Sequence, residues 1–174
     1  HPCASSTQAA LFGAGRPRSV AQAPQQPYLA GKTKGRIVTE DEVLAEFRAA
    51  DALLEGHFIL SSGLRSSRYL QCARVLMDPR RGARLAEALA AQIPAELRER
   101  ITAVVSPAMG GVIAGHEMAR ALGVPAMFVE RPTGTFELRR GFRLELGQEV
   151  LMMEDVVTTG LSSREAIKGI AVSY

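Results

Sequence analysis

The sequence has few cysteines and no long apolar run, and each absence excludes a class of protein. Cys3 and Cys72 are too few for the disulfide framework of a small secreted domain. We therefore expect two free thiols in a reducing compartment. No apolar stretch approaches the roughly 20 residues that cross a bilayer, which argues against a membrane protein. The 174 residues are enough for one compact domain with its own core.

Acidic residues are absent from the first 39 positions, which hold five Lys and Arg residues. The other positions hold the remaining 16 of the 21 basic residues and all 18 acidic residues, so the net charge of +3 comes from the leading segment. Nucleic-acid binding needs basic residues clustered on a folded face. We therefore expect neither a nucleic acid nor a membrane as a partner.

Residues 1–36 also lack an apolar period and are rich in small and polar residues. Such a composition cannot bury enough surface to offset its ordering entropy. We expect a disordered basic leader over 1–36 and a folded domain over 37–174. An acid-free basic leader is also typical of an organelle transit peptide, so targeting remains the alternative to a cytoplasmic location.

Capping signals mark two helices near the start of the domain. Thr39 and Glu42 form a capping box, and apolar residues recur at helical spacing from there through Leu54. The pair Asp78–Pro79 places a cap before a proline at the first helical position, where its missing N–H costs nothing. The spacing predicts a second helix from this point to Pro94.

The pattern changes after residue 100. Three short, nearly continuous apolar runs at 101–105, 124–129 and 150–153 are typical of strands that are buried on both faces. A helix of suitable length is predicted between the first two, over 111–122. The sequence therefore predicts an α/β fold with a parallel sheet flanked by helices, preceded by an N-terminal helical segment.

Two adjacent carboxylates, Glu154 and Asp155, stand at the end of the third predicted strand. A Thr-Thr-Gly turn at 158–160 follows them, and Ser162 with Glu165 predicts a capping box that opens a helix. Helix N-termini offer free N–H groups and positive partial charge to a phosphate. Ligands of parallel sheets bind at this end of the strands. The alternative is a solvated acidic pair beside an ordinary helix cap.

Two further segments have residues suited to anions. The loop at 106–111 ends in two glycines, which permit a backbone that points N–H groups at an anion, although a plain turn would use them too. The segment at 128–142 contains Arg131, Arg139 and Arg140, whose guanidinium groups match phosphate oxygens. Pro132 and Gly134 favour a mobile loop, and a cationic lid over a leaving group is one interpretation. Solvated arginines on a surface hairpin are the other.

The thirteen residues 150–162 resemble the phosphoribosyl pyrophosphate signature of type I phosphoribosyltransferases at each position. The loop at 106–111 is similar to the pyrophosphate loop of that family, in which a non-proline cis peptide is typical. The resemblance implies that Glu154 and Asp155 face the ribose hydroxyls and act in catalysis with Arg139 and Arg140. The residues that it places against the substrates are Arg65, Met109, Gly110, Arg131, Val156, Val157, Thr158, Thr159, Gly160, Leu161 and Ser162.

The segment 56–71 resembles the acceptor region of orotate phosphoribosyltransferases, and the similarity extends from about Val43 to Ile170. This resemblance implies transfer of the phosphoribosyl group of phosphoribosyl pyrophosphate to orotate, giving orotidine 5′-monophosphate for UMP biosynthesis. It also implies a homodimer and a Mg²⁺ ion that arrives with the substrate rather than in a dedicated protein site. The alternatives are a non-catalytic regulator that binds phosphoribosyl pyrophosphate and a purine phosphoribosyltransferase.

Three positions depart from the pattern of that family. Arg65 stands where Lys or His is usual, which keeps the charge but changes its geometry. The segment 132–141 contains no Lys, so Arg139 or Arg140 would replace the usual lid lysine. The chain ends at Tyr174, before the further strands expected of the family. We expect a C-terminally truncated domain with an exposed sheet edge and little or no activity of its own.

Overall fold

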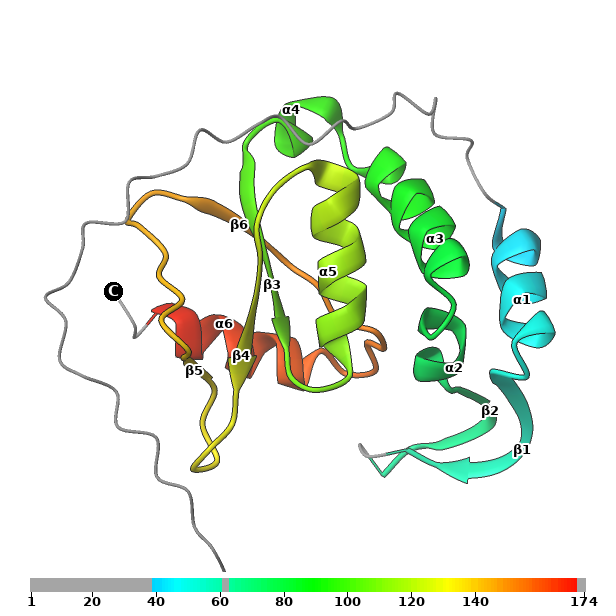
Figure 1. The fold of residues 1–174 in the computed structure, drawn as a ribbon. Coiled ribbons are helices and arrows are strands. Elements are labelled where there is room, and N and C mark those ends of the chain that lie inside the picture. Colours follow the sequence, from blue (N-terminus) through cyan, green and yellow to red (C-terminus); the bar gives the residue numbers. More distant parts are fainter. Residues whose placement is uncertain (1–38, 61–62, 172–174) are drawn as a thin grey trace, which may run out of the picture.

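The computed structural model describes residues 39–60 and 63–171, and they form three layers (Figure 1). A four-stranded sheet in the order β5-β4-β3-β6 lies in the middle. Helix α5 packs on β3 and β4 and is covered in turn by α3, whereas α6 contacts the strands from the other side. A separate hairpin, β1-β2, lies beside this body. The expected leader at 1–36 and Cys3 lie outside the described residues.

The N-terminal segment confirms one prediction and corrects another. Helix α1 spans Glu40–Ala49 and begins with the expected capping box between Thr39 and Glu42. The helix does not continue through Leu54, because residues Leu53–Ile59 form strand β1. This strand pairs antiparallel with β2, Arg65–Leu70, and Leu54 lies opposite Tyr69. Cross-strand pairing therefore overrides the helical spacing of the apolar residues.

Three helices follow the hairpin. Helix α2 spans Cys72–Leu76, and α3 spans Pro79–Gln92. The carboxylate of Asp78 accepts a hydrogen bond from the N–H of Arg80 at 2.9 Å, so the predicted cap and the proline after it are confirmed. Helix α4, Ala95–Arg98, is one short turn before the sheet.

The sheet contains the three predicted strands. They are β3, Ile101–Pro107, β4, Ala126–Glu130, and β6, Glu149–Met152, and both β4 and β6 pair parallel with β3. Helix α5, Gly111–Leu122, connects β3 to β4 over the predicted residues. Strand β5, Glu137–Leu138, adds an antiparallel pair to β4, and α6 spans Leu161–Ala171. Because the chain leaves β3 toward β4 on one side and returns to β6 on the other, the carboxyl end of β3 lies at a topological switch point.

Alternate residues of β3 build the core on the two faces of the sheet. Val104 packs with Met118 and Ala119 of α5, whereas Val105 packs with Val129 and with Ala166 of α6. All six of these side chains are almost completely buried. Strand β3 is therefore covered on both faces, as its continuous apolar run predicts. No helix among the described residues is long and apolar enough to cross a membrane.

Candidate active site

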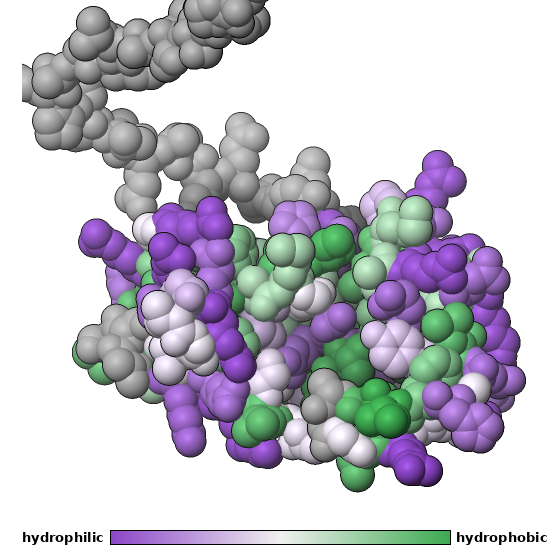
Figure 2. Space-filling view, turned by 90° about the horizontal axis from the view of Figure 1, so that it is seen from below, coloured by the Kyte–Doolittle hydropathy of each residue, from purple (hydrophilic) through white to green (hydrophobic). Residues whose placement is uncertain are grey.

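A cleft with a volume of about 760 Å³ opens at the carboxyl ends of the parallel strands. Its walls come from the end of β1, from β2, from the residue after β4, and from the loop between β6 and α6. Figure 2 looks onto this end of the molecule, where polar and hydrophobic surface lie side by side. The lining residues are Ile59, Leu60, Arg68, Tyr69, Leu70, Gln71, Arg131, Glu154, Asp155, Val156, Thr158, Thr159, Gly160, Leu161, Ser162 and Glu165.

The predicted phosphate loop lies in this cleft, but its helix begins one residue early. Helix α6 starts at Leu161, whose N–H donates to the Oγ1 of Thr159 at 3.4 Å. Ser162 therefore lies inside the first turn and is not the cap, so the predicted capping box is wrong. Gly160 takes the left-handed backbone conformation, with φ at 68°, immediately before the helix. The loop still presents hydroxyl groups and a helix N-terminus to the cleft.

The two acids after β6 are held by different neighbours. The Glu154 carboxylate accepts a hydrogen bond from the Ser163 hydroxyl on α6. The backbone carbonyl of Asp155 accepts one from the thiol of Cys72 at 3.3 Å. Both acids are half-buried and line the cleft. Their carboxylates can accept hydrogen bonds from the hydroxyl groups of a bound sugar.

The glycine loop after β3 lies directly beside Asp155. The peptide bond between Ala108 and Met109 is cis, as the resemblance implies. A Cβ atom added to Gly110 would lie 2.9 Å from each carboxylate oxygen of Asp155. A side chain there would displace the acid, so glycine is required for this close approach. Met109 is 86% exposed, and neither it nor Gly110 is among the cleft-lining residues.

Arg131 supplies a cation to the cleft wall. Its guanidinium pairs with the Glu165 carboxylate on α6 at 2.6 Å and stacks on the ring of Phe136, 4.1 Å from the ring centre. Phe136 is itself buried against Ala166 and Ile170 of α6. The two contacts orient the Arg131 guanidinium at the wall of the cleft.

The segment 132–141 is more firmly packed than the predicted mobile loop. Phe136 anchors it in the core, and strand β5 pairs with β4. Arg140 donates two hydrogen bonds to Glu130, at 2.6 and 2.9 Å, and these bonds are the main reason that the pKa of Glu130 is lowered. Arg139 is exposed, and neither arginine is among the described residues that line the cleft. The structure thus brings Arg131 to the acids but not Arg139 or Arg140.

The hairpin β1-β2 contributes residues that the sequence interpretation missed. Arg68 and Tyr69 line the cleft, whereas the predicted Arg65 is exposed at the start of β2 and does not. In the sequence, the adjacent cationic and aromatic residues Arg68 and Tyr69 were the signal that could have identified this part of the cleft. Of the remaining predicted residues, Val157 is 65% exposed and lies outside the cleft lining.

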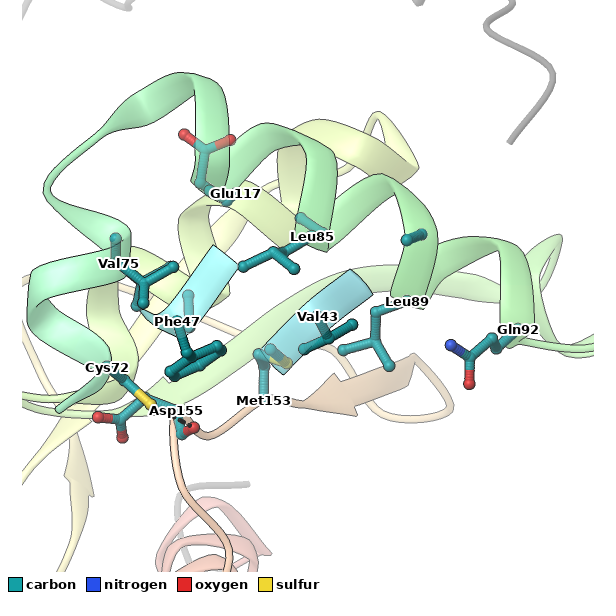
Figure 3. A pocket seen from close by; sticks show the side chains of 15 residues that line it. Val43, Phe47, Cys72, Val75, Leu85, Leu89, Gln92, Glu117, Met153 and Asp155 are labelled. Carbon is teal, nitrogen blue, oxygen red and sulfur yellow. Dashed lines mark hydrogen bonds between the residues drawn. The ribbon is translucent and has the colours of Figure 1, made fainter. Parts of the chain in front are cut away.

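A second, apolar cavity of about 210 Å³ lies behind Asp155, between α1, α2, α3 and α5 (Figure 3). Phe47, Leu85 and Met153 are among its walls, and Cys72 and Asp155 lie at one end. Burial, with a smaller contribution from the Asp155 charge, raises the pKa of the Cys72 thiol to about 11. Asp155 lines both the cleft and this cavity.

Comparisons with known proteins agree on one family. The orotate phosphoribosyltransferase of Rhizorhabdus wittichii is 78% identical to the chain over 133 residues, which are 76% of this chain and 68% of that protein. The orotate phosphoribosyltransferase of Maricaulis maris is 60% identical over 133 residues, covering 76% and 69%. No family model matches the chain.

Solved structures share the fold. The crystal structure of orotate phosphoribosyltransferase from Aeropyrum pernix has a TM-score of 0.59 and 28% identity, over 76% of this chain and 75% of that one. The structure of Leishmania donovani UMP synthase also has a TM-score of 0.59, at 18% identity, over 76% of this chain and 28% of that one. The second likeness concerns the fold alone.

Proposed function

The chain belongs to the orotate phosphoribosyltransferase family, and we propose that its cleft transfers the phosphoribosyl group of 5-phosphoribosyl 1-pyrophosphate to orotate. The products are orotidine 5′-monophosphate and pyrophosphate. The observation that carries the proposal is the position of the 154–162 loop. Its acids, hydroxyl groups and helix N-terminus all line the cleft, to which the hairpin also contributes residues. Family membership argues against the purine enzyme and the non-catalytic regulator as alternatives.

The donor is bound by the loop between β6 and α6. The hydroxyl groups of Thr158, Thr159 and Ser162 and the free N–H groups at the start of α6 suit the 5′-phosphate. Glu154 and Asp155 accept hydrogen bonds from the ribose hydroxyl groups. The loop at 106–111, which abuts Asp155 at Gly110, is the segment that we expect to bind the pyrophosphate.

The acceptor enters from the side of the hairpin. Arg68 and Tyr69 line the same cleft as the donor loop and offer a cation and an aromatic face to a planar, anionic base. Arg65 at the start of the same strand is a further candidate for this role. Such an arrangement would set the base opposite the ribose, as displacement at the anomeric carbon requires.

Family membership implies a Mg²⁺ ion that arrives with the donor. Mg²⁺ binds substrate phosphates and keeps much of its water shell, so Glu154 and Asp155 would hold it through the ribose hydroxyl groups that they bind and not as direct ligands. Within the described ranges, no group of three or more His, Cys, Asp or Glu side chains is placed to hold a metal ion. Bound to the donor, the ion would neutralise charge on the leaving pyrophosphate. The chain's own residues would orient the ribose.

A homodimer is the proposed assembly, and in it Arg139 could contact a ligand in the cleft of the other subunit. Large hydrophobic side chains are exposed at Ile59, Leu64 and Val157, which a second subunit could cover. Arg140 is occupied by Glu130, so Arg139 is the better candidate for the cation that replaces the lid lysine. In a dimer, this arginine would reach the neighbour's cleft. Sedimentation equilibrium of the chain tests the assembly directly.

Calorimetric titration of the chain with phosphoribosyl pyrophosphate and Mg²⁺ tests the donor site. We expect saturable binding that Asp155→Asn weakens at least about tenfold, since an acceptor of ribose hydroxyl bonds loses its charge. Asp41→Asn on the exposed start of α1 is the matched control and should bind as the wild type does. Orotate-dependent release of pyrophosphate then tests the reaction. A chain that folds by circular dichroism and binds no donor contradicts the proposal.

A further inference from the structure

Ser163 contacts one of the two acids of the site without lining the cleft. Its hydroxyl donates a hydrogen bond to the Glu154 carboxylate oxygen Oε2, and both side chains are half-buried. Glu154 lines the cleft, whereas Ser163 is absent from the described residues that do. An effect of the Ser163 side chain on a ligand would therefore act through Glu154.

The two adjacent serines of α6 have different surroundings. Ser162 and Ser163 both lie in the first turn, and successive residues of a helix point about 100° apart. Ser162 lines the cleft, and Ser163 is directed back to the end of β6. The sequence shows two equivalent serines, and only the position of the helix separates their roles.

The bond also closes the loop that holds the phosphate-binding residues. Glu154 lies just after β6, and Ser163 lies nine residues later in α6. A hydrogen bond between a hydroxyl and a carboxylate is stronger than one between neutral groups. It therefore sets the direction of the Glu154 carboxylate relative to the N-terminus of the helix. Its second oxygen, Oε1, is left to accept from a ligand.

We propose that Ser163 is a positioning residue, which holds the Glu154 carboxylate in the orientation that accepts the ribose hydroxyl groups of the donor. The inference rests on the proposed function and adds a residue to it. A carboxylate without this partner can rotate about its side-chain torsions, and binding must then restrict it again. This loss of preorganisation should weaken the binding of ligands that contain a ribose, and it should not change the affinity for pyrophosphate by itself.

The variant Ser163→Ala removes the hydroxyl group that donates this hydrogen bond, and it should leave the fold intact. Alanine has a higher helix propensity than serine, so the helix itself should not be weakened. Ser163→Thr keeps a hydroxyl and serves as the conservative rescue. Ile167→Ala is the control on the same helix, because Ile167 is 52% exposed and has no part in the site.

The test measures the Kd of two probes, phosphoribosyl pyrophosphate with Mg²⁺ and inorganic pyrophosphate with Mg²⁺. For Ser163→Ala, we expect the first Kd to rise about tenfold, the scale of a hydrogen bond to a charged group, and the second to stay within about twofold. Ser163→Thr should recover most of the loss, and Ile167→Ala should behave as the wild type.

A double-mutant cycle with Glu154→Ala decides whether Ser163 acts through the acid. In that background, Ser163→Ala should have no further effect on the Kd of phosphoribosyl pyrophosphate, because the group that it positions is gone. If the wild-type chain binds phosphoribosyl pyrophosphate and the Ser163→Ala variant binds it with equal affinity, this inference is overturned and the proposed function still stands. Equal losses for both probes, or losses that add in the cycle, also overturn it. A folded wild-type chain that binds no donor removes the proposed function and this inference with it.

Discussion

The Cys72 thiol donates a hydrogen bond to the backbone carbonyl of Asp155 over 3.3 Å, although 82 residues separate them in the chain. Cys72 is the first residue of α2 and follows the hairpin that lines the proposed acceptor side of the cleft. Asp155 lines the proposed donor side. The contact therefore joins the two halves of the site through a buried residue.

The raised pKa of the Cys72 thiol predicts a loss of stability at high pH. The pKa is about 11 in the folded chain, against an ordinary value of 9.0. Between these values the unfolded chain releases a proton that the folded chain retains, so the free energy of unfolding falls as the pH rises. Urea unfolding in steps from pH 8 upward should show a steeper fall for the wild type than for Cys72→Ser, whose hydroxyl does not ionise there. Parallel curves for the two proteins would contradict this expectation.

Gly110→Ala should weaken donor binding. The new Cβ would lie 2.9 Å from both carboxylate oxygens of Asp155, closer than real Cβ atoms come to other atoms. Either the acid or the loop must move, so we expect a rise of about tenfold or more in the Kd of phosphoribosyl pyrophosphate, the scale of a lost hydrogen bond to a charged group. Gly56→Ala is the control, because its Cβ would meet the Phe58 ring at 3.4 Å, an ordinary contact. Equal affinities for the two variants would sink the prediction.

Arg131→Ala should reduce both affinity for the anionic donor and its dependence on salt. The Arg131 guanidinium lines the cleft and is oriented there by Glu165 and Phe136. We expect a Kd about tenfold higher at low salt and a smaller difference at high salt, where screening already weakens the attraction. Arg100→Ala is a matched control, because Arg100 also pairs with a glutamate, Glu149, and does not line the cleft. An equal effect of the two substitutions would assign the loss to net charge alone.

Gly169→Ala tests the packing of the 132–141 segment on α6. An added Cβ would lie 2.1 Å from the backbone oxygen of Phe136, a contact that requires the backbone to shift. We expect a loss of about 2 kcal/mol in the free energy of unfolding, within the range measured for overpacked cores. Ile167→Ala, at an exposed position of the same helix, should change stability much less. Unfolding of both variants in urea gives the comparison, and an unchanged midpoint for Gly169→Ala would show that the segment does not rest on the helix.

The sequence by itself determined the elements whose causes are local. The Thr39 capping box, the Asp78–Pro79 helix start and the apolar runs of the three parallel strands depend on residues within a few positions of one another. The same holds for the loop at 154–162, whose acids, hydroxyl groups and glycine are contiguous. The spacing could therefore predict the fold class and a loop with acids and hydroxyl groups at the carboxyl end of a strand; its role in binding the donor stays a prediction.

Only the tertiary structure decided which side chains meet across the fold. The strand pairing of Leu54 with Tyr69 replaced the predicted end of the first helix, because the partner strand satisfies the backbone that a helix would otherwise use. Arg68 entered the cleft rather than Arg65 because the hairpin register sets which residues of β2 reach it. Contacts such as those of Ser163 with Glu154 and of Arg140 with Glu130 depend on where whole elements pack, and no local pattern encodes that placement.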